Sequence, residues 1–231
     1  MKETFLAFVA AHFVVDFLLQ PDWLQQRKDR LWANMLHSAF VAGLTYLFLQ
    51  QWNAWIPPVL VFFAHGLVDA VKQRCRDTWR SFCVDQAVHL GLTILILRFC
   101  LRFGWIEYFG GTGLRWMVLV AGFAMSVQGA GFLVGKVAAK LQEENALAEK
   151  INGLENGGKL IGQLERAMIF LFIMIGHPSG IGFLVAAKSI LRFGEAKDDQ
   201  KLAEYVLVGT LLSFSLAITV AALTKAVVET L

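Results

Sequence analysis

Long apolar segments separated by turn-forming residues constrain this chain more than any other feature. A membrane-spanning helix needs about 20 mostly apolar residues, and segments near that length recur along all 231 residues. Breakers separate them, such as Pro21 after the first segment and Pro57-Pro58 at the third. The eight expected spans are residues 4–20, 34–51, 54–72, 82–102, 115–136, 160–177, 180–194 and 203–227. We therefore expect an all-α fold, a polytopic transmembrane helical bundle.

The composition agrees with a membrane protein and excludes several other classes. Hydrophobic residues make up 57% of the chain and charged residues 17%, whereas soluble domains have about a quarter charged residues. The net charge is only +3 and the basic residues lie in short loops, so we expect no nucleic-acid partner. The 3 cysteines contain no CxxC pair and are expected to be free thiols. We expect one transmembrane domain over residues 1–231, with membrane lipids as its partners.

The distribution of lysine and arginine predicts the orientation, because basic loops stay in the cytoplasm. Most of the 21 lysines and arginines, Lys28 and Lys72 among them, lie after spans one, three, five and seven. Both termini are therefore expected outside the cytoplasm, on the periplasmic or extracellular side. The stretch KVAAKLQEENALAEK at 136–150 is expected to form a surface amphipathic helix, and the short seventh span either crosses the membrane or is re-entrant.

A repeated pattern relates two helical hairpins. The sequence around His12, with Asp16 and Gln20 at spacings of four, recurs around His65. Asn34-Met-Leu-His37 likewise corresponds to Gln86-Ala-Val-His89. We therefore predict repeat A at 4–51, repeat B at 54–102 and C-terminal helices at 115–227. Internal duplication commonly places a shared site at the repeat interface.

Helical geometry brings the histidines and aspartates of these hairpins to one depth. A spacing of four residues places His12 and Asp16 on one helix face. Asp85 and His89 occur in the reverse order on a helix that runs the other way, so they lie at the same level. We expect one polar pocket one to two turns inside the cytoplasmic boundary. It contains His12, Asp16, His37, His65, Asp69, Asp85 and His89.

The chemistry of this set points to a metal ion. An ionisable side chain inside a membrane costs several kcal/mol unless it is paired. Imidazole and carboxylate together are ligands for divalent transition metals, with zinc the first choice and manganese or iron the alternatives. The predicted metal ligands are His12, His37, His65, Asp69 and His89. Asp85 and Asp16 are the predicted catalytic carboxylates, Asp85 as a general base or a further ligand.

The same pocket is compatible with two arrangements that need no catalytic metal ion. Histidine and aspartate also fasten helices together through hydrogen bonds. A haem held by two histidines fits a four-helix arrangement as well, although haem ligation does not require the interleaved carboxylates.

Further polar residues are predicted to bind a substrate. Lys188 and Arg192 lie one turn apart and suit an anionic headgroup, unless they anchor the protein beside Glu165 and Glu204. The predicted substrate-binding residues are Arg166, Lys188, Arg192, Gln20 and Gln86. Gly131 and Gly135 form a GxxxG motif, which favours close helix packing first and a homodimer second.

Several motifs resemble a known family. HFxxDFxxQ, HxxxDxxxQ, DQxxH and the later AAKSILRF and EYxxxGTLLS are similar to the prokaryotic membrane family called domain of unknown function 3307, over nearly the whole chain. The resemblance implies an integral inner-membrane protein and no settled activity. Histidine and aspartate on neighbouring helices are also similar, by analogy only, to membrane-embedded metal-dependent hydrolases.

These observations lead to three hypotheses for the function. The first is a metal-dependent hydrolase that acts from the cytoplasmic side on a lipid or a phosphorylated amphiphile. The second is a transporter, or a metal or proton carrier, that uses the same cluster. The third is a non-catalytic membrane scaffold with a buried polar network.

Overall fold

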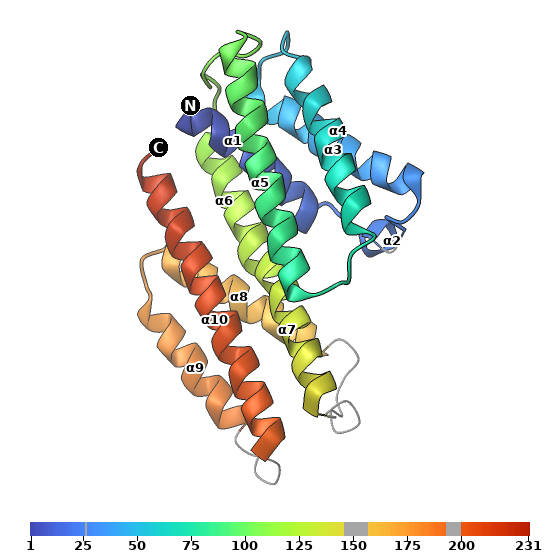
Figure 1. Cartoon of the computed structure of the whole chain (residues 1–231). Coiled ribbons are helices and arrows are strands. Elements are labelled where there is room, and N and C mark those ends of the chain that lie inside the picture. Colours follow the sequence, from blue (N-terminus) through green and yellow to red (C-terminus); the bar gives the residue numbers. More distant parts are fainter. Residues whose placement is uncertain (26, 146–156, 193–199) are drawn as a thin grey trace. The chain divides into compact units, whose positions relative to one another are not determined.

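The structure is a computed structural model that describes residues 1–25, 27–145, 157–192 and 200–231 (Figure 1). The chain divides into two compact units, Met1–Ala124 together with Leu231, and Met125–Thr230. The described residues are helical with no strand, so the expected all-α class is confirmed for them. The expected single transmembrane domain stays a prediction, and each unit is described by itself.

The first unit surrounds a common interior with four of its helices (Figure 1). Its elements are α1 (Lys2–Phe17), α2 (Asp22–Gln25), α3 (Leu31–Leu49), α4 (Ile56–Lys72), α5 (Trp79–Arg102) and α6 (Leu114–Ala124). Helix α1 contacts α3, α5 and α6, while α4 contacts α3 and α5. Helices α1, α3, α4 and α5 therefore form a closed ring of neighbours.

Local sequence explains where these helices begin and end. Helix α1 ends before Pro21, because a proline disfavours helical geometry in the residue before it. Helix α4 begins with Pro57 and Pro58 in its first turn, where a missing N–H costs nothing. Thr78 caps α5, since its Oγ1 accepts a hydrogen bond from the Ser81 N–H at 3.1 Å. Ser81 Oγ accepts one from the Thr78 N–H at 3.1 Å in return.

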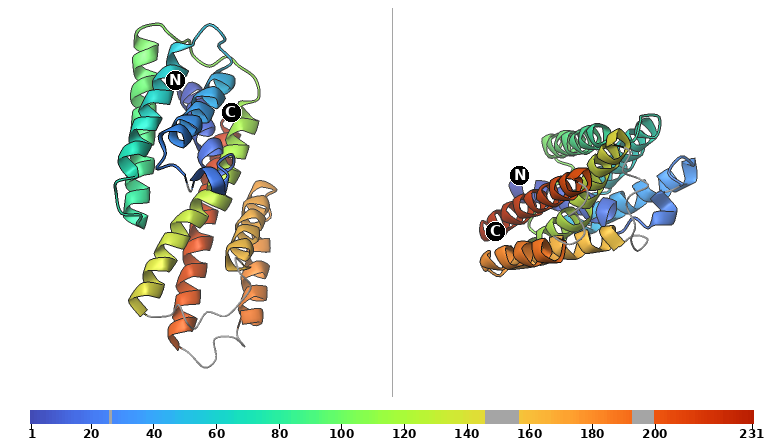
Figure 2. Two further views of the ribbon diagram at one scale, coloured as in Figure 1. Left: turned by 90° about the vertical axis from the view of Figure 1, so that its right-hand side faces the viewer. Right: turned by 90° about the horizontal axis from the view of Figure 1, so that it is seen from below.

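The second unit begins with a π-helical turn, η1 (Met125–Gly129), which leads into α7 (Ala130–Asn145). Helices α8 (Gly157–Met174), α9 (Ser179–Arg192) and α10 (Gln200–Glu229) follow. Helix α8 packs against α9 and α10, and α10 packs against α7 (Figure 2). Ile169, Phe214 and Ala217 form the core.

The stretch expected to form a surface helix at 136–150 is helical over its described part, but it is not a separate helix. Residues 136–145 belong to α7 and continue the apolar helix that precedes them. Residues 146–150 of that stretch lie outside the described residues.

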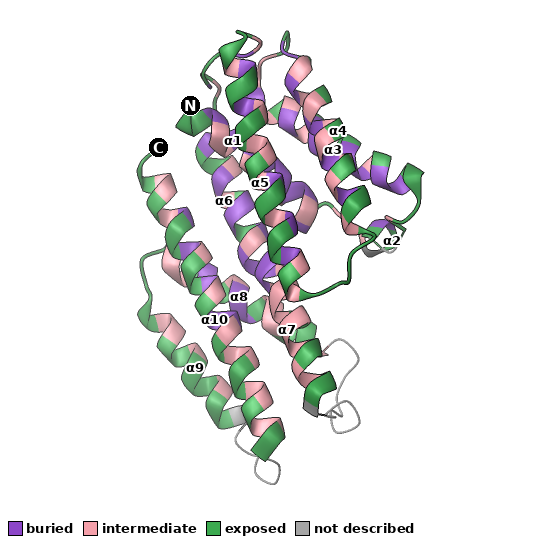
Figure 3. Ribbon diagram, viewed as in Figure 1, coloured by how far each residue is buried: buried purple, intermediate pink, exposed green. Residues whose placement is uncertain are grey.

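Three helices in the described part of the chain are long and apolar enough to cross a membrane. They are Trp79–Arg102, Leu114–Glu144 and Gln200–Glu229, with 24, 31 and 30 residues. Figure 3 shows exposed residues along the outer faces of the helices. On α4 the exposed face is apolar and consists of Val59, Phe63, Leu67 and Val71, while the buried face carries His65 and Asp69. An apolar outside around a polar inside suggests a membrane protein.

The structure does not support the eight expected crossings. A helix lies at each expected segment, but α1 has 16 residues and α4 has 17. At about 1.5 Å per residue these helices fall short of a hydrocarbon core of about 30 Å. The repeat is not supported either. The first hairpin has helices of 16 and 19 residues joined through α2, and the second has helices of 17 and 24 residues joined by a turn.

Candidate metal centre

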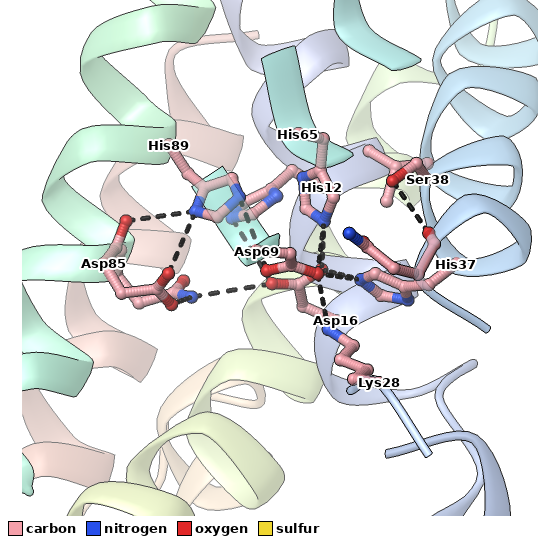
Figure 4. A network of polar contacts seen from close by, with 12 residues as sticks. His12, Asp16, Lys28, His37, Ser38, His65, Asp69, Asp85 and His89 are labelled. Carbon is pink, nitrogen blue, oxygen red and sulfur yellow. Dashed lines mark hydrogen bonds and ion pairs between the residues drawn. The ribbon is translucent and has the colours of Figure 1, made fainter. Parts of the chain in front are cut away.

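Seven histidine and aspartate side chains meet in the interior of the first unit (Figure 4). Helix α1 contributes two of them, α3 one, and α4 and α5 two each. We call them the His/Asp cluster: His12, Asp16, His37, His65, Asp69, Asp85 and His89. The six members other than Asp16 are at most 6% exposed, and the Asp16 side chain is 10% exposed. The structure therefore brings together every residue expected in the polar pocket.

Asp16 lies among three histidines. Its Oδ1 is 3.2 Å from His37 Nε2 and 3.6 Å from His65 Nε2. Its Oδ2 is 3.7 Å from His12 Nε2, one helical turn away on α1. Gln86 Nε2 also approaches Asp16 Oδ2, at 3.5 Å. Both oxygens of this carboxylate thus face imidazole nitrogens.

Asp69 faces histidines with both oxygens as well, but it also has a lysine partner. Its Oδ2 is 3.6 Å from His65 Nε2 and 3.7 Å from His37 Nε2, and its Oδ1 is 3.9 Å from His89 Nε2. Lys28 Nζ donates a hydrogen bond to Asp69 Oδ2 at 2.8 Å. Asp69 therefore links the histidines to a partly buried ammonium group.

Asp85 and His89 form the edge of the cluster on α5. His89 Nδ1 is 3.0 Å from the main-chain oxygen of Asp85. When Nδ1 donates this hydrogen bond, the lone pair of Nε2 is free for a metal. Lys72 Nζ donates to Asp85 Oδ2 at 2.6 Å, and Gln86 Nε2 approaches the same oxygen at 3.3 Å.

Many polar atoms of the cluster are buried without a hydrogen bond in the described part of the chain. They include Nε2 of His12, His37, His65 and His89, and Oδ1 of Asp16 and Asp85. A buried polar atom without a partner costs about 1–3 kcal/mol. A network of hydrogen bonds that only fastens helices together is therefore incomplete here.

Most of the distances are too long for hydrogen bonds and lie at or slightly beyond the separation of two ligand atoms on one metal ion. All but one of the histidine-to-aspartate distances are 3.6–3.9 Å, whereas hydrogen bonds measure about 2.7–3.2 Å. Ligand atoms held about 2.0–2.2 Å from one tetrahedral ion lie about 3.3–3.6 Å from each other. Three groups have ligand atoms within 4.8 Å of one another: His12, Asp16 and His65; His37, His65 and Asp69; and Asp69, Asp85 and His89.

Helices α3 and α4 approach closely beside the cluster. Asn34 Nδ2 donates to the Gly66 main-chain oxygen at 2.9 Å. A Cβ at Gly66 would lie 3.0 Å from Ser38 Oγ, so the glycine allows the close contact. This contact holds His37 and His65 on adjacent helices.

A cavity borders the cluster on the side of three imidazoles. Its polar lining includes His12, His65 and His89. Its apolar lining is formed by Phe8, Val41, Val61, Ala64, Leu92 and Ile96. The arrangement places an apolar space next to candidate metal ligands.

Lys28 and Lys72 were not expected in the site, because the sequence assigned them to membrane anchoring. Lys72 reaches Asp85 on the next helix, and Lys28 lies between α2 and α3. Gln20 bridges Asp16 and Lys28. When its amide nitrogen donates to the Asp16 main-chain oxygen at 3.3 Å, its amide oxygen accepts from Lys28 Nζ at 3.1 Å. A lysine one turn after an HxxxD motif is the only local signal, and it applies to Lys72 alone.

The other predicted substrate-binding residues lie in the second unit. Arg166 is buried, and its Nε donates to the Val127 main-chain oxygen at 2.9 Å. Lys188 Nζ pairs with Glu165 Oε2 at 2.7 Å, as expected for a lysine that anchors the protein. The side chain of Arg192 lies outside the described residues. The role of these residues in substrate binding stays a prediction.

Comparison with known proteins adds a family but no activity. No curated protein and no solved structure matches the chain. The resemblance expected over nearly the whole chain is found over a shorter range, and AAKSILRF and EYxxxGTLLS lie outside it. Residues 4–110, which contain the whole His/Asp cluster, match the family described as "Protein of unknown function (DUF3307)".

Proposed function

We propose that the protein is an integral membrane protein that binds a divalent transition metal in the His/Asp cluster and uses it to hydrolyse a lipid or a phosphorylated amphiphile. The observation that carries the metal is the set of buried imidazole nitrogens and carboxylate oxygens without hydrogen bonds. Their separations of mostly 3.6–3.9 Å leave room for an ion between them. Zinc is the first choice because mixed histidine and carboxylate sites are its usual catalytic form, with manganese or iron next.

The chain's own residues have distinct roles in this proposal. Imidazoles on all four helices of the ring supply neutral nitrogen ligands, and Asp16 and Asp69 supply negative charge between them. Asp85 takes the second of its two expected roles, that of a further ligand, and we assign Asp16 to the same role. A bound dication supplies the Lewis acidity that lets water attack an ester or phosphate bond near neutral pH.

The surroundings of the cluster support an amphiphilic substrate. The cavity beside His12, His65 and His89 has room for about one water molecule, enough for the water that attacks but not for the substrate itself. The apolar outer faces of the helices would place this cavity inside a membrane, where lipids are the available substrates.

We also propose a bacterial inner-membrane location with both termini outside the cytoplasm. The bias of lysine and arginine toward one set of loops supports this orientation. It would place the cluster near the cytoplasmic side.

The metal is tested by elemental analysis of protein purified in detergent without chelators. We expect at least one equivalent of zinc, manganese or iron in the wild type. His65→Ala is expected to lose metal, because His65 belongs to two of the three ligand groups. His177→Ala is the matched control, since His177 lies in an exposed turn between α8 and α9. Wild type without metal would return the cluster to a purely structural role.

Hydrolysis is tested on the loaded protein in vesicles. Phosphatidic acid vesicles report phosphate release, and phosphatidylcholine vesicles report fatty acid release. We expect one of these activities to need the metal and to disappear in His65→Ala but not in His177→Ala. Metal binding with no release from either vesicle would contradict the hydrolase and keep the metal site.

A metal carrier is a second candidate, favoured by one observation. Lys28 and Lys72 neutralise Asp69 and Asp85 in the absence of metal, as a carrier requires when its site is empty. Uptake of zinc into proteoliposomes containing a zinc-sensitive dye, without lipid hydrolysis, would support the carrier.

A further inference from the structure

We infer that the His/Asp cluster holds two metal ions, in a first site formed by His12, Asp16 and His65 and a second site formed by Asp69, Asp85 and His89. The ammonium groups of two lysines occupy the second site until an ion displaces them. This inference rests on the proposed function, because it concerns the same cluster and assumes that it binds metal.

The composition of the three ligand groups favours two ions over one. The first and second sites share no residue. The remaining group, His37, His65 and Asp69, takes one residue from each of them. An ion there would break up both sites, whereas two ions leave each with three protein ligands. His37 Nε2 is 3.2 Å from Asp16 Oδ1 and is then available as a fourth ligand of the first ion.

Unpartnered buried atoms lie in both sites. The first site contains His12 Nε2 and Asp16 Oδ1, and the second contains His89 Nε2 and Asp85 Oδ1. Each atom has lost its hydrating water with no protein hydrogen bond in return. A single ion in the first site would leave the donors of the second site without a partner, whereas two ions would satisfy both sets.

The lysines distinguish the two sites. Lys28 Nζ lies 2.8 Å from Asp69 Oδ2, and Lys72 Nζ lies 2.6 Å from Asp85 Oδ2. Both carboxylates belong to the second site. Asp16 of the first site has no ion pair with a lysine or arginine in the described part of the chain. An ammonium group on one oxygen of a carboxylate repels a dication at the other oxygen, so the first site is open and the second is guarded.

Both lysines are able to leave without unfolding a helix. Lys28 lies on the connection between α2 and α3, and Lys72 is the last residue of α4. Their side chains are 11% and 29% exposed, so neither lysine is fully enclosed by the unit. A long flexible stem lets such a group turn outward into water when an ion takes its place. The first ion therefore binds tightly, and the second binds more weakly.

Calorimetric titration with zinc tests this arrangement on the full chain, stripped with a chelator and held in detergent. The wild type is expected to bind one ion tightly and one weakly. Lys28→Met and Lys72→Met should each tighten the weaker step by about tenfold, with the tight step unchanged. Lys140→Met is the control, because Lys140 pairs with Glu144 on the exposed surface of α7.

Two aspartate variants identify the sites. Asp16→Asn should remove the tight step, and Asp85→Asn should remove the weak one. Folding is checked by size exclusion and helical circular dichroism, and Lys72→Met alone decides the role of the lysines if Lys28→Met does not fold.

The outcomes separate this inference from the proposed function. One ion in the wild type and in both lysine variants overturns the two-ion centre and keeps the metal site. Two steps that do not respond to either lysine variant overturn the guarding role. No ion in any variant overturns both proposals.

Discussion

Breaking the ion pair between Lys28 and Asp69 should strongly destabilise the metal-free protein. The two side chains are 11% and 4% exposed, and their charged atoms are 2.8 Å apart. Removing one partner of a buried pair costs about 3–5 kcal/mol, because a charge is left without compensation. The pair Lys140 and Glu144, at 3.3 Å with both side chains 55% exposed, is a control in the same chain. An exposed pair contributes about 0–1 kcal/mol.

A double-mutant cycle measures the difference. Lys28→Met, Asp69→Asn and the double variant are unfolded in mixed micelles with a chelator present, alongside Lys140→Met, Glu144→Gln and their double variant. We expect the first cycle to give a coupling energy above about 2 kcal/mol, with the double variant more stable than the sum of the single losses predicts. The second cycle should stay below about 1 kcal/mol. Equal coupling energies in the two cycles would refute the assignment of Lys28 to the buried cluster.

Three further predictions address other parts of the chain. Gly131→Ala should lower the thermal unfolding temperature, because its Cβ would lie 2.5 Å from a buried guanidinium nitrogen, at a cost of about 1–3 kcal/mol. A Cβ at Gly135 would have no heavy atom within 4 Å, so Gly135→Ala should not lower the unfolding temperature. Equal decreases for the two variants would instead indicate a symmetric GxxxG contact. His89→Ala should reduce the metal content in elemental analysis while the protein stays inserted, and an unchanged content would remove His89 from the ligands. The orientation is tested with a variant in which Cys75 is the only exposed thiol. A membrane-impermeant maleimide should label Cys75 only after cells are permeabilised, and should not label buried Cys100. Labelling of intact cells would reverse the proposed orientation.

Local sequence was sufficient to predict the helices and the composition of the cluster. Hydrophobic runs and breakers such as Pro21 act within a few residues, so a helix lies at each expected segment. The spacing of four between His12 and Asp16, and between His65 and Asp69, acts within one helical turn. An ionisable group on an apolar helix is expected to face the protein interior. This expectation predicted that the polar faces of four helices meet.

The expected membrane spans and the observed candidate spans differ because of helix length. Apolar composition does not show where hydrogen bonding stops, and α1 and α4 stop too early for a crossing of their own. The opposite occurred in α7, where a charged stretch continued an apolar helix. Hydrogen bonds to the preceding helical turns extend the helix into this stretch even though its side chains become polar.

The sequence by itself determined that the chain is helical, apolar on the outside and equipped with histidines and aspartates on common faces. Only the tertiary structure decided which of these groups face one another and which cations already pair with them. Lys28 reaches Asp69 across 41 residues of chain, and Lys72 reaches Asp85 across 13. Periodicity describes one helix at a time, whereas such contacts depend on how helices pack, and packing follows from the shapes and charges of all the neighbours together.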